Sequence, residues 1–370
     1  MRSTRPLARL AMIIIAIIAV TSPGAASATG ARRVHVVWPG QSVQAAIDAA
    51  APGDTVVLRP GTYRENLSIT TNGLTLVGFG ARLEAPAVPT PAGCVPAEQP
   101  NPVGVCVSGE TDADTGQTVE VADVTIRGLT VGRFPSTGIM VLHGRRTRIE
   151  RVDATGGTAY GILILRSSDN TVTGSTLHGG QSAGLYIGES PEARSTVTGN
   201  RMYDNVTFGI YVRTASYGII TGNQVEGSCI GIGFIPTHPA EDAVAHWRVT
   251  ANRITANNRL CESASGPVTG IGVYLGGTKE ITVDHNRIEA NTGAPGTPHS
   301  WGGGIVVNDG SLYGFPNQPI DNQIRHNLLR DNLPYDIMVV VPGTGNTITA
   351  NRCEASSPPG LCRPRTGSRR

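Results

Sequence analysis

The sequence predicts an all-β fold, a parallel β-helix in which short strands wind into stacked coils of roughly 23 residues. Two repeated phrases carry this prediction. The first is Gly-Ile or Gly-Leu followed by alternating apolar residues, and it recurs at spacings of 23, 23, 25 and 22 residues, at Gly138, Gly161, Gly184, Gly209 and Gly231. It continues at Gly270 and Gly304, and Asp336-Ile337 is a degenerate last copy.

The second phrase is a short strand that ends in a turn residue and an asparagine, as in TVTGN at Thr196–Asn200 and ITAN at Ile348–Asn351. Several strands per repeat, separated by Gly, Asn and Asp turns, are typical of a solenoid. Leucine-rich repeats have a similar length, but this chain lacks their dense Leu pattern. We expect one hydrogen-bonded ladder of side chains at a turn of the coils, formed by Asn200, Asn223, Asn252, Asn286, Asn327 and Asn351.

Residues 1–28 have the pattern of a secretory signal peptide. Three arginines precede an apolar run from Leu10 to Val20, and Ala26–Ala28 is a small-residue cleavage pattern. An uncleaved anchor is the alternative, but the run is shorter than the ~20 apolar residues that a spanning helix needs. We therefore expect a protein cut before Thr29, secreted to the extracellular space and without a membrane span.

The remaining chain divides into four predicted segments. Residues 29–80 form an N-terminal cap and the first coils, where Ser42 precedes an amphipathic helix with Val43 and Ile47 on one face. Such a helix is suited to cover the open apolar end of a solenoid. A loop-rich insertion at 81–123, the main coils at 124–354 and a disordered basic tail at 355–370 follow.

Charge and cysteine content narrow the functional classes. Without the signal peptide and the last eight residues, the chain has 23 basic and 28 acidic residues. This balance does not indicate the basic surface that binds nucleic acid. Six cysteines in an exported chain predict disulfides. Fifteen pairings are open, and proximity gives Cys94–Cys106, Cys229–Cys261 and Cys353–Cys362. Only the second pair has further support, because both its cysteines precede a Gly-Ile strand in consecutive coils.

The segment Trp38–Ile69 and the coils after it resemble the right-handed parallel β-helix superfamily of pectate lyases and mannuronan epimerases, and the NosD-like proteins with the same repeat. The resemblance covers nearly all of the mature chain and implies a right-handed solenoid. It says little about chemistry, because this fold hosts lyases, hydrolases, epimerases and inert adhesins.

Candidate site residues follow from the alternation along the strands. Ile210 and Val212 are expected to point into the core, so Tyr211 and Arg213 point outward, with Tyr186 beside Tyr211 on the adjacent coil. Exposed aromatic side chains in a row suit the flat faces of sugar rings. Further candidates on the same face or at its strand ends are His143, Arg166, Glu189, Tyr274, Asn308 and Asp309.

Longer segments flank these strands and predict the walls of a groove. They are Pro236–His246, Asn258–Thr269, Thr292–Gly303 and Asp309–Asn322, with Trp247, His299 and Trp301 in or beside them.

These residues favour proton abstraction on an acidic polysaccharide. A lyase or C5 epimerase needs a cation for the uronate carboxylate and a group that exchanges the proton. Arg213 or Arg166 would serve as the cation, and Tyr211, Tyr186 or His143 would exchange the proton. Glu189, Tyr274, Asn308, Asp309, Trp301 and His299 would join Tyr186 in binding the substrate.

Two other activities stay open as alternatives, a non-catalytic glycan- or surface-binding protein and a glycoside hydrolase. A hydrolase needs two carboxyl groups about 5–9.5 Å apart, and the outward columns hold no adjacent acidic pair. The same scarcity of carboxylates argues against a calcium site, and we expect no metal and no cofactor. We also expect the protein to be a monomer.

The segment Gly231–Asp242, GIGFIPTHPAED, loosely resembles the Tyr-Gly-Phe-Asp-Pro-His-Asp signature of alginate epimerases. Ile235 stands where that family carries its catalytic aspartate. The departure argues against an intact alginate epimerase.

Overall fold

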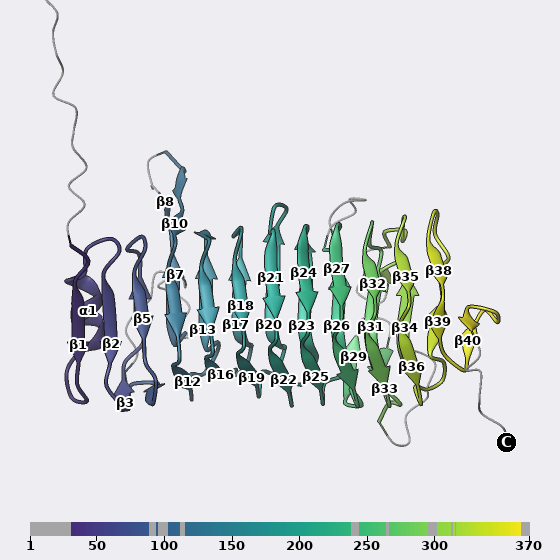
Figure 1. Cartoon of the computed structure of the whole chain (residues 1–370), viewed down its shortest axis with the longest axis horizontal. Coiled ribbons are helices and arrows are strands. Elements are labelled where there is room, and N and C mark those ends of the chain that lie inside the picture. The colour runs from purple at the N-terminus through teal and green to yellow at the C-terminus, as the bar shows by residue number, and fades with distance from the viewer. Residues whose placement is uncertain are drawn as a thin grey trace, which may run out of the picture. The chain divides into compact units, whose positions relative to one another are not determined.

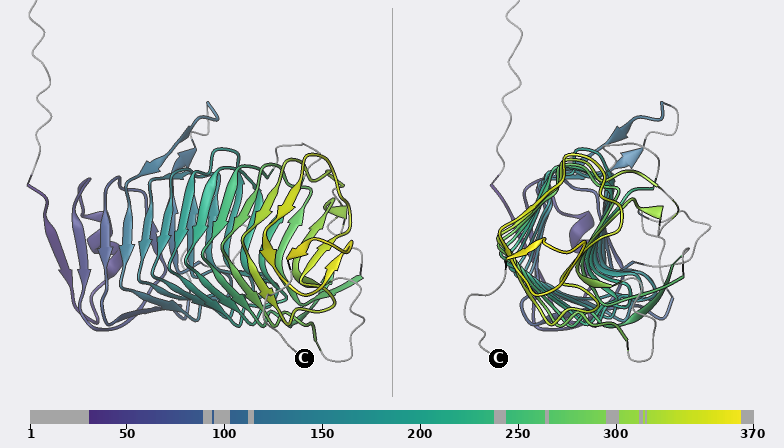
Figure 2. Two further views of the ribbon diagram at one scale, coloured as in Figure 1. Left: turned by 45° about the vertical axis from the view of Figure 1, so that its right-hand side comes forward. Right: turned by 90° about the vertical axis from the view of Figure 1, so that its right-hand side faces the viewer.

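The computed structural model describes residues 31–88, 94, 103–111, 115–237, 244–263, 266–294, 302–311, 314 and 316–363. The chain divides into two units, Met1–Ala31 and Arg32–Arg370. The predicted signal segment 1–28 lies outside the described residues. The second unit contains every helix and strand named below, and Figures 1 and 2 show it as a stack of coils.

The prediction of a parallel β-helix is confirmed. Nearly every coil contributes one strand to each of three long sheets, here called A, B and C, and the pairs within them are parallel. In the described part of the chain the sheets contain 12, 12 and 11 strands.

Sheet A consists, in spatial order, of β1 (Val34–Val37), β2 (Thr55–Leu58), β5 (Thr75–Val77), β11 (Thr125–Arg127), β15 (Arg148–Glu150), β18 (Thr171–Thr173), β21 (Ser195–Thr198), β24 (Gly218–Thr221), β27 (Trp247–Thr250), β32 (Thr282–Asp284), β35 (Gln323–Arg325) and β38 (Thr347–Thr349).

Sheet B consists of β3 (Gly61–Arg64), β6 (Ala81–Glu84), β12 (Thr130–Gly132), β16 (Asp153–Thr155), β19 (Thr176–His178), β22 (Arg201–Tyr203), β25 (Gln224–Glu226), β28 (Arg253–Thr255), β33 (Arg287–Glu289), β36 (Leu328–Arg330), β39 (Asn351–Arg352) and β41 (Cys362–Arg363).

Sheet C consists of β4 (Leu67–Ile69), β7 (Val105–Ser108), β13 (Ile139–Leu142), β17 (Tyr160–Leu165), β20 (Ala183–Ser190), β23 (Phe208–Ala215), β26 (Ile230–Ile235), β31 (Ile271–Gly276), β34 (Gly303–Asn308), β37 (Ile337–Val339) and β40 (Ser356–Ser357). Three small pairs complete the strands: β8 (Glu110–Thr111) with β9 (Thr118–Val119), β10 (Val121–Ala122) with β14 (Gly144–Arg145), and β29 (Leu260–Ser263) with β30 (Gly266–Thr269).

The repeated Gly-Ile phrase has a steric cause. Gly209, the second residue of β23, lies so close to the next coil that a Cβ atom at this position would overlap Val225 and the carbonyl oxygen of Gly231. The two residues that follow at alternate positions, Ile210 and Val212, are fully buried in the core, as the sequence predicts. Burying each such side chain stabilises the fold by about 1.5–3 kcal/mol.

The predicted asparagine ladder is also confirmed. Asn223 Nδ2 donates to Asn252 Oδ1 at 3.0 Å, and Asn252 Nδ2 donates in turn to Asn286 Oδ1 at 3.0 Å. The series continues through Asn327 to Asn351. Each amide also receives a backbone N–H from the preceding rung, so buried polar groups at this turn are satisfied from coil to coil.

The N-terminal end of the stack is covered as expected. Helix α1 (Val43–Asp48) is capped by Ser42, whose Oγ accepts the Ala45 N–H at 3.1 Å, and it buries Val43 and Ile47. It contacts β1, β2 and β4 and lies within the outline of the coils in the end-on view of Figure 2.

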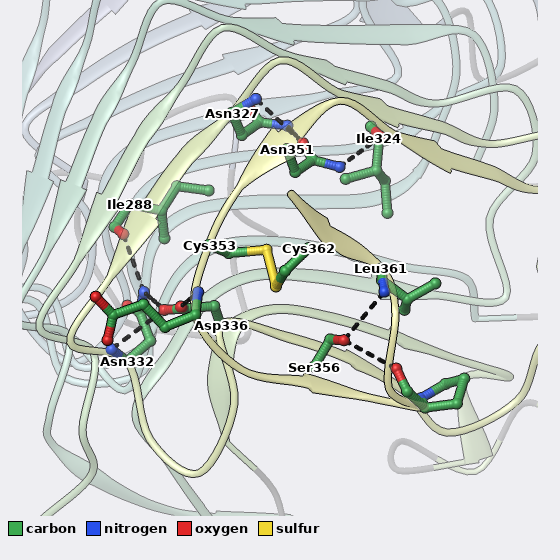
Figure 3. The surroundings of a disulfide bond; sticks show 12 residues. Ile288, Ile324, Asn327, Asn332, Asp336, Asn351, Cys353, Ser356, Leu361 and Cys362 are labelled. Carbon is green, nitrogen blue, oxygen red and sulfur yellow. Dashed lines mark hydrogen bonds between the residues drawn. A yellow bond between two sulfur atoms is a disulfide. The ribbon is translucent and has the colours of Figure 1, made fainter. Parts of the chain in front are cut away.

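All three predicted cysteine pairs are formed, with Cα–Cα distances of 5.7, 6.0 and 5.0 Å in sequence order. Figure 3 shows the last pair, Cys353–Cys362, beside the end of the asparagine ladder. The described part of the predicted disordered tail, 355–363, contributes β40 and β41, and Ser356 Oγ accepts the Leu361 N–H at 3.2 Å. The predicted insertion at 81–123 likewise supplies β6 and β7 to the long sheets.

Acid is expected to loosen the first coils through Asp54. This buried carboxylate accepts hydrogen bonds from His35 Nε2 at 2.9 Å and from the backbone N–H groups of Arg33 and Ala51. The His35 contact is the main cause that lowers the pKa of Asp54 to about 2. A carboxyl whose folded pKa lies below its ordinary value of about 3.9 stabilises the fold above that value and loses its contribution as the pH falls toward 2.

Circular dichroism melts from pH 5 to pH 2 check this expectation. The Tm of the wild type should fall more steeply with pH than the Tm of Asp54→Asn, which cannot titrate at this position. Parallel slopes for the two proteins would contradict it.

Candidate functional site

The candidate site lies on the outward face of sheet C, where β20 and β23 are adjacent. Their register pairs Tyr186 with Tyr211 and Gly188 with Arg213, as the repeat spacing predicts. The rings of Tyr186 and Tyr211 are 5.0 Å apart between centroids and meet edge to face. Tyr211 also stacks on Phe208 at 4.2 Å, and Tyr186 contacts Tyr160 at 4.8 Å.

The expectation that Tyr186 is exposed is wrong, because only 2% of it is accessible to solvent. Its ring lies along the strand over Gly188, where any Cβ atom would overlap the phenol. Apolar residues from the insertions cover this face. One cluster joins Tyr186 to Cys94, Val103 and Cys106.

A second apolar cluster covers the following coils. It joins Phe208 to the Cys229–Cys261 pair and to Val268 of the β29–β30 hairpin. Tyr211 packs against both clusters and remains partly exposed. The outward face of sheet C therefore has its own apolar layer, and Tyr211 lies where its two parts meet.

Arg213 is the basic residue of this site. It is partly buried near the Tyr186 phenol, and its Nε is buried without a hydrogen-bond partner among the described residues. No carboxylate of the described residues lies within ion-pair distance of it. Arg166, in contrast, pairs with Glu189 at 2.9 Å, and Arg194 pairs with Asp169 at 2.7 Å.

Burial controls the protonation of the tyrosines. Loss of solvent raises the pKa of Tyr186 to about 12, although the nearby guanidinium of Arg213 opposes the shift. The pKa of Tyr211 is raised further for the same reason. Both phenols are therefore protonated at neutral pH and are hydrogen-bond and proton donors.

A column of polar residues follows the strands of sheet C at one corner of the coils. His143, Arg166 and Glu189 occupy it on successive coils, and each has a left-handed backbone, with φ of 53°, 48° and 49°. Partial burial is the main cause that lowers the pKa of His143, and the Arg166 cation lowers it further. His143 is therefore a neutral imidazole at neutral pH.

Tyr274 occupies a different column from the predicted one. In the repeated phrase Gly270 is aligned with Gly231, which would place Tyr274 in the same row of residues as Arg213. The strand register instead pairs Gly233 with Tyr274, so the residue equivalent to Gly231 is Gly272. The β29–β30 hairpin takes up the two extra residues. Tyr274 consequently lies in the column of Tyr211, is fully buried, and accepts a 3.4 Å hydrogen bond from Asn308 Nδ2.

Burial excludes other predicted residues from direct contact with a ligand. Asn308 is 1% exposed, and Trp247 is a core residue whose Nε1 donates to the Ala215 carbonyl at 2.9 Å. Asp309 is partly exposed after β34, and Glu189 is exposed. His299 and Trp301 lie outside the described residues.

Two pockets in the described part of the chain lie away from this face. One of about 520 Å³ adjoins α1 and is lined by Gln44 and Glu65, and one of about 400 Å³ lies in the last coils beside Val339 and Leu361. Neither is lined by a predicted site residue, so the groove predicted over the Gly-Ile strands has no counterpart in these pockets.

Tyr160 and Phe208 are site neighbours that the sequence analysis did not single out. Each directly precedes the glycine of the repeated phrase, and that position is the signal that identifies them. Both side chains join the outer apolar layer on sheet C instead of the core inside the coils.

Comparisons with known proteins agree with the fold. A family model described as a right-handed β-helix region matches residues 112–242. No curated protein matches the sequence.

Solved structures match over most of the chain at low identity. The A-module of mannuronan C-5 epimerase AlgE4 from Azotobacter vinelandii is 16% identical, with a TM-score of 0.55 over 85% of this chain and 94% of the module. The GH136 lacto-N-biosidase from Eubacterium ramulus is 11% identical, with a TM-score of 0.56 over 86% of this chain and 67% of that one.

The Dettilon tailspike protein is 15% identical, with a TM-score of 0.54 over 86% of this chain, which spans 60% of the tailspike. Such identities establish a shared fold and leave the activity open. The chain is therefore a right-handed parallel β-helix protein.

Proposed function

We propose that the mature protein is a secreted, carbohydrate-active β-helix protein that acts as a polysaccharide lyase or epimerase on an acidic polysaccharide. The observation that carries the proposal is the state of Arg213. A partly buried guanidinium with no carboxylate partner among the described residues is suited to bind an anionic group from outside the chain. The carboxylate of a uronate sugar is such a group.

The neighbouring groups suit proton abstraction beside that carboxylate. Charge moves onto the carboxylate as the proton leaves, and Arg213 would stabilise it. Tyr211, protonated, partly exposed and near Arg213, would act as the proton donor. The proton acceptor would be either His143 or the ionised form of Tyr211.

The pH dependence of turnover distinguishes these two acceptors. The neutral form of His143 persists below the ordinary imidazole pKa of about 6.5, so a reaction with this base would remain active in weak acid. A reaction that needs ionised Tyr211 would accelerate through the alkaline range, because the pKa of this phenol is raised. His143 itself follows β13, which is three strands from β23 in sheet C, about 14 Å by strand spacing, and this distance favours Tyr211 for the sugar held by Arg213.

A second candidate function is non-catalytic binding of a glycan. The burial of Tyr186 favours it, because a side chain that is 2% exposed cannot exchange a proton with a bound sugar, whereas binding needs only Arg213 and the partly exposed Tyr211. Hydrolysis is the weakest alternative. Glu189 and Asp309 are four strands apart in sheet C, about 19 Å, whereas the two carboxyl groups of a glycosidase lie within about 9.5 Å.

Export is proposed on the signal-peptide pattern and on the three cysteine pairs, which persist in oxidising compartments. No helix in the described ranges is long and apolar enough to span a membrane. The partner would be a polysaccharide or cell-wall glycan met outside the cell.

Incubation of the mature protein with a panel of uronate polysaccharides tests the proposal. A rise in ultraviolet absorbance from unsaturated uronate ends would establish a lyase, and a change in the proton NMR spectrum without this absorbance would establish an epimerase. Retention on immobilised polysaccharide without either change would establish the binding function. Absence of turnover and of retention across the panel would overturn the proposal.

A further inference from the structure

The turn that precedes the asparagine ladder differs in two adjacent coils. The residue directly before each ladder asparagine has a left-handed backbone throughout, and it is a small residue at Gly199, Gly222, Ala251 and Ala350. Histidine occupies the same position at His285 and His326, with φ of 55° and 53°. The two imidazole rings stack with centroids 5.0 Å apart at the ends of β32 and β35, whose sheet is labelled in Figure 1.

Both rings turn a nitrogen toward one buried carboxylate. Asp284 is the last residue of β32 and only 3% exposed. Its Oδ1 lies 2.6 Å from His285 Nδ1 and 3.5 Å from His326 Nδ1. Despite these short distances Oδ1 is buried and has no hydrogen-bond partner among the described residues. The two imidazole nitrogens thus lie close to Oδ1, but not in the orientation of a hydrogen-bond donor toward its acceptor.

The other carboxylate oxygen holds Asp284 in place. Oδ2 lies 3.4 Å from Arg248 Nη2 and 3.9 Å from Arg325 Nε. The guanidinium groups therefore orient the carboxylate from one side and leave Oδ1 to the imidazoles on the other. Fixing a ligand by contacts to its second oxygen is the arrangement found around metal-binding carboxylates.

We infer that Asp284, His285 and His326 form a binding site for a divalent transition-metal ion of the zinc type. Their ligand atoms all lie within 4.8 Å of one another, so one ion can reach all three with small side-chain movements. Two imidazole nitrogens and one carboxylate oxygen suit Zn²⁺, whereas Ca²⁺ and Mg²⁺ prefer all-oxygen sites. Three protein ligands would leave a further position for water.

The ion would bind on sheet A and link two coils separated by 41 residues of chain. It is independent of the proposed glycan site on sheet C. The nearby Arg248 and Arg325 cations weaken the attraction for a second positive charge, so we expect micromolar rather than nanomolar affinity. Because bound imidazoles must be unprotonated, affinity should fall as the pH is lowered.

The sequence analysis found no metal cluster, because the three ligands come from two separate copies of the repeat, VDHN and IRHN. Neither copy alone has the spacing of a known metal motif. Only the register of β32 with β35 brings His285 beside His326.

Calorimetric titration of the mature protein, free of any polyhistidine tag and with its disulfides intact, with zinc chloride tests the inference. One ion should bind per chain, and saturating zinc should raise Tm by roughly 3–5 °C. His285→Ala and His326→Ala should each weaken zinc binding at least tenfold. Alanine already occupies the equivalent position at Ala251 and Ala350, so both variants are expected to fold.

His178→Ala is the matched control, since His178 pairs with Asp153 on sheet B and should leave zinc binding unchanged. Magnesium chloride should give no comparable heat. Lack of zinc binding by the wild type at millimolar concentration would overturn the inference. Equal zinc affinity in the wild type and the double alanine variant would overturn it as well.

Discussion

Replacement of Arg213 by alanine is expected to lower kcat/KM on a uronate polysaccharide by about 10²–10³-fold. The guanidinium is the partly buried cation of the site that has no carboxylate partner among the described residues, so its loss removes the charge that would stabilise the developing enolate. Arg213→Lys keeps the charge but loses the planar pair of donors, and we expect an intermediate loss. Initial rates of formation of unsaturated ends, or NMR rates for an epimerase, measure the effect.

Two further variants separate chemistry from folding. Arg194→Ala removes an exposed arginine whose partners are Asp169 and Glu192, and its activity should equal that of the wild type. Tyr211→Phe keeps the ring stacked on Phe208 and removes only the hydroxyl, so it should lower kcat more than it changes KM. Full activity in Arg213→Ala, with the fold verified by circular dichroism, would exclude Arg213 as the cation.

The largest expected effect on stability comes from the centre of the asparagine ladder. Asn223 is 1% exposed, and its side chain accepts both the backbone and the side-chain N–H of Asn200. Its Nδ2 also donates to the Val197 and Thr221 carbonyls and to Asn252. Asn223→Ala leaves several of these buried groups without hydrogen-bond partners, and we expect the free energy of unfolding to fall by about 2–4 kcal/mol.

Guanidinium titration of the oxidised protein measures this loss, with Asn351→Ala as the matched control. Asn351 is the last rung, so its side chain accepts from Asn327 and donates to Ile324 but continues no further. Its replacement should cost clearly less than that of Asn223. Equal and small losses at the two positions would mean that the ladder contributes little to stability.

The repeat determines the fold so strongly because its signals are local. A glycine, a ladder asparagine and alternating apolar residues recur in most coils, and each of them restricts the same backbone. Ile210, Val212 and the Ser42-capped helix could all be predicted from such short patterns, whereas the cysteine pairs rested mainly on proximity in the sequence.

The site was predicted less well, because its surroundings come from segments outside the repeat. Nothing in the phrase around Tyr186 indicates that Cys94, Val103 and the β29–β30 hairpin supply apolar side chains that cover sheet C. The two-residue shift at Tyr274 has the same origin, since the hairpin alters the register where it rejoins the sheet. The sequence analysis did not identify the cluster of Asp284, His285 and His326, because these residues come together only through strand pairing across a long insertion.

The structure of the protein with a bound uronate oligosaccharide tests the central claim most directly. The account predicts a sugar carboxylate within hydrogen-bond distance of the Arg213 guanidinium, with the Tyr211 hydroxyl facing the same sugar. An oligosaccharide bound on another face of the coils, with Arg213 still in contact with Tyr186 alone, would contradict it.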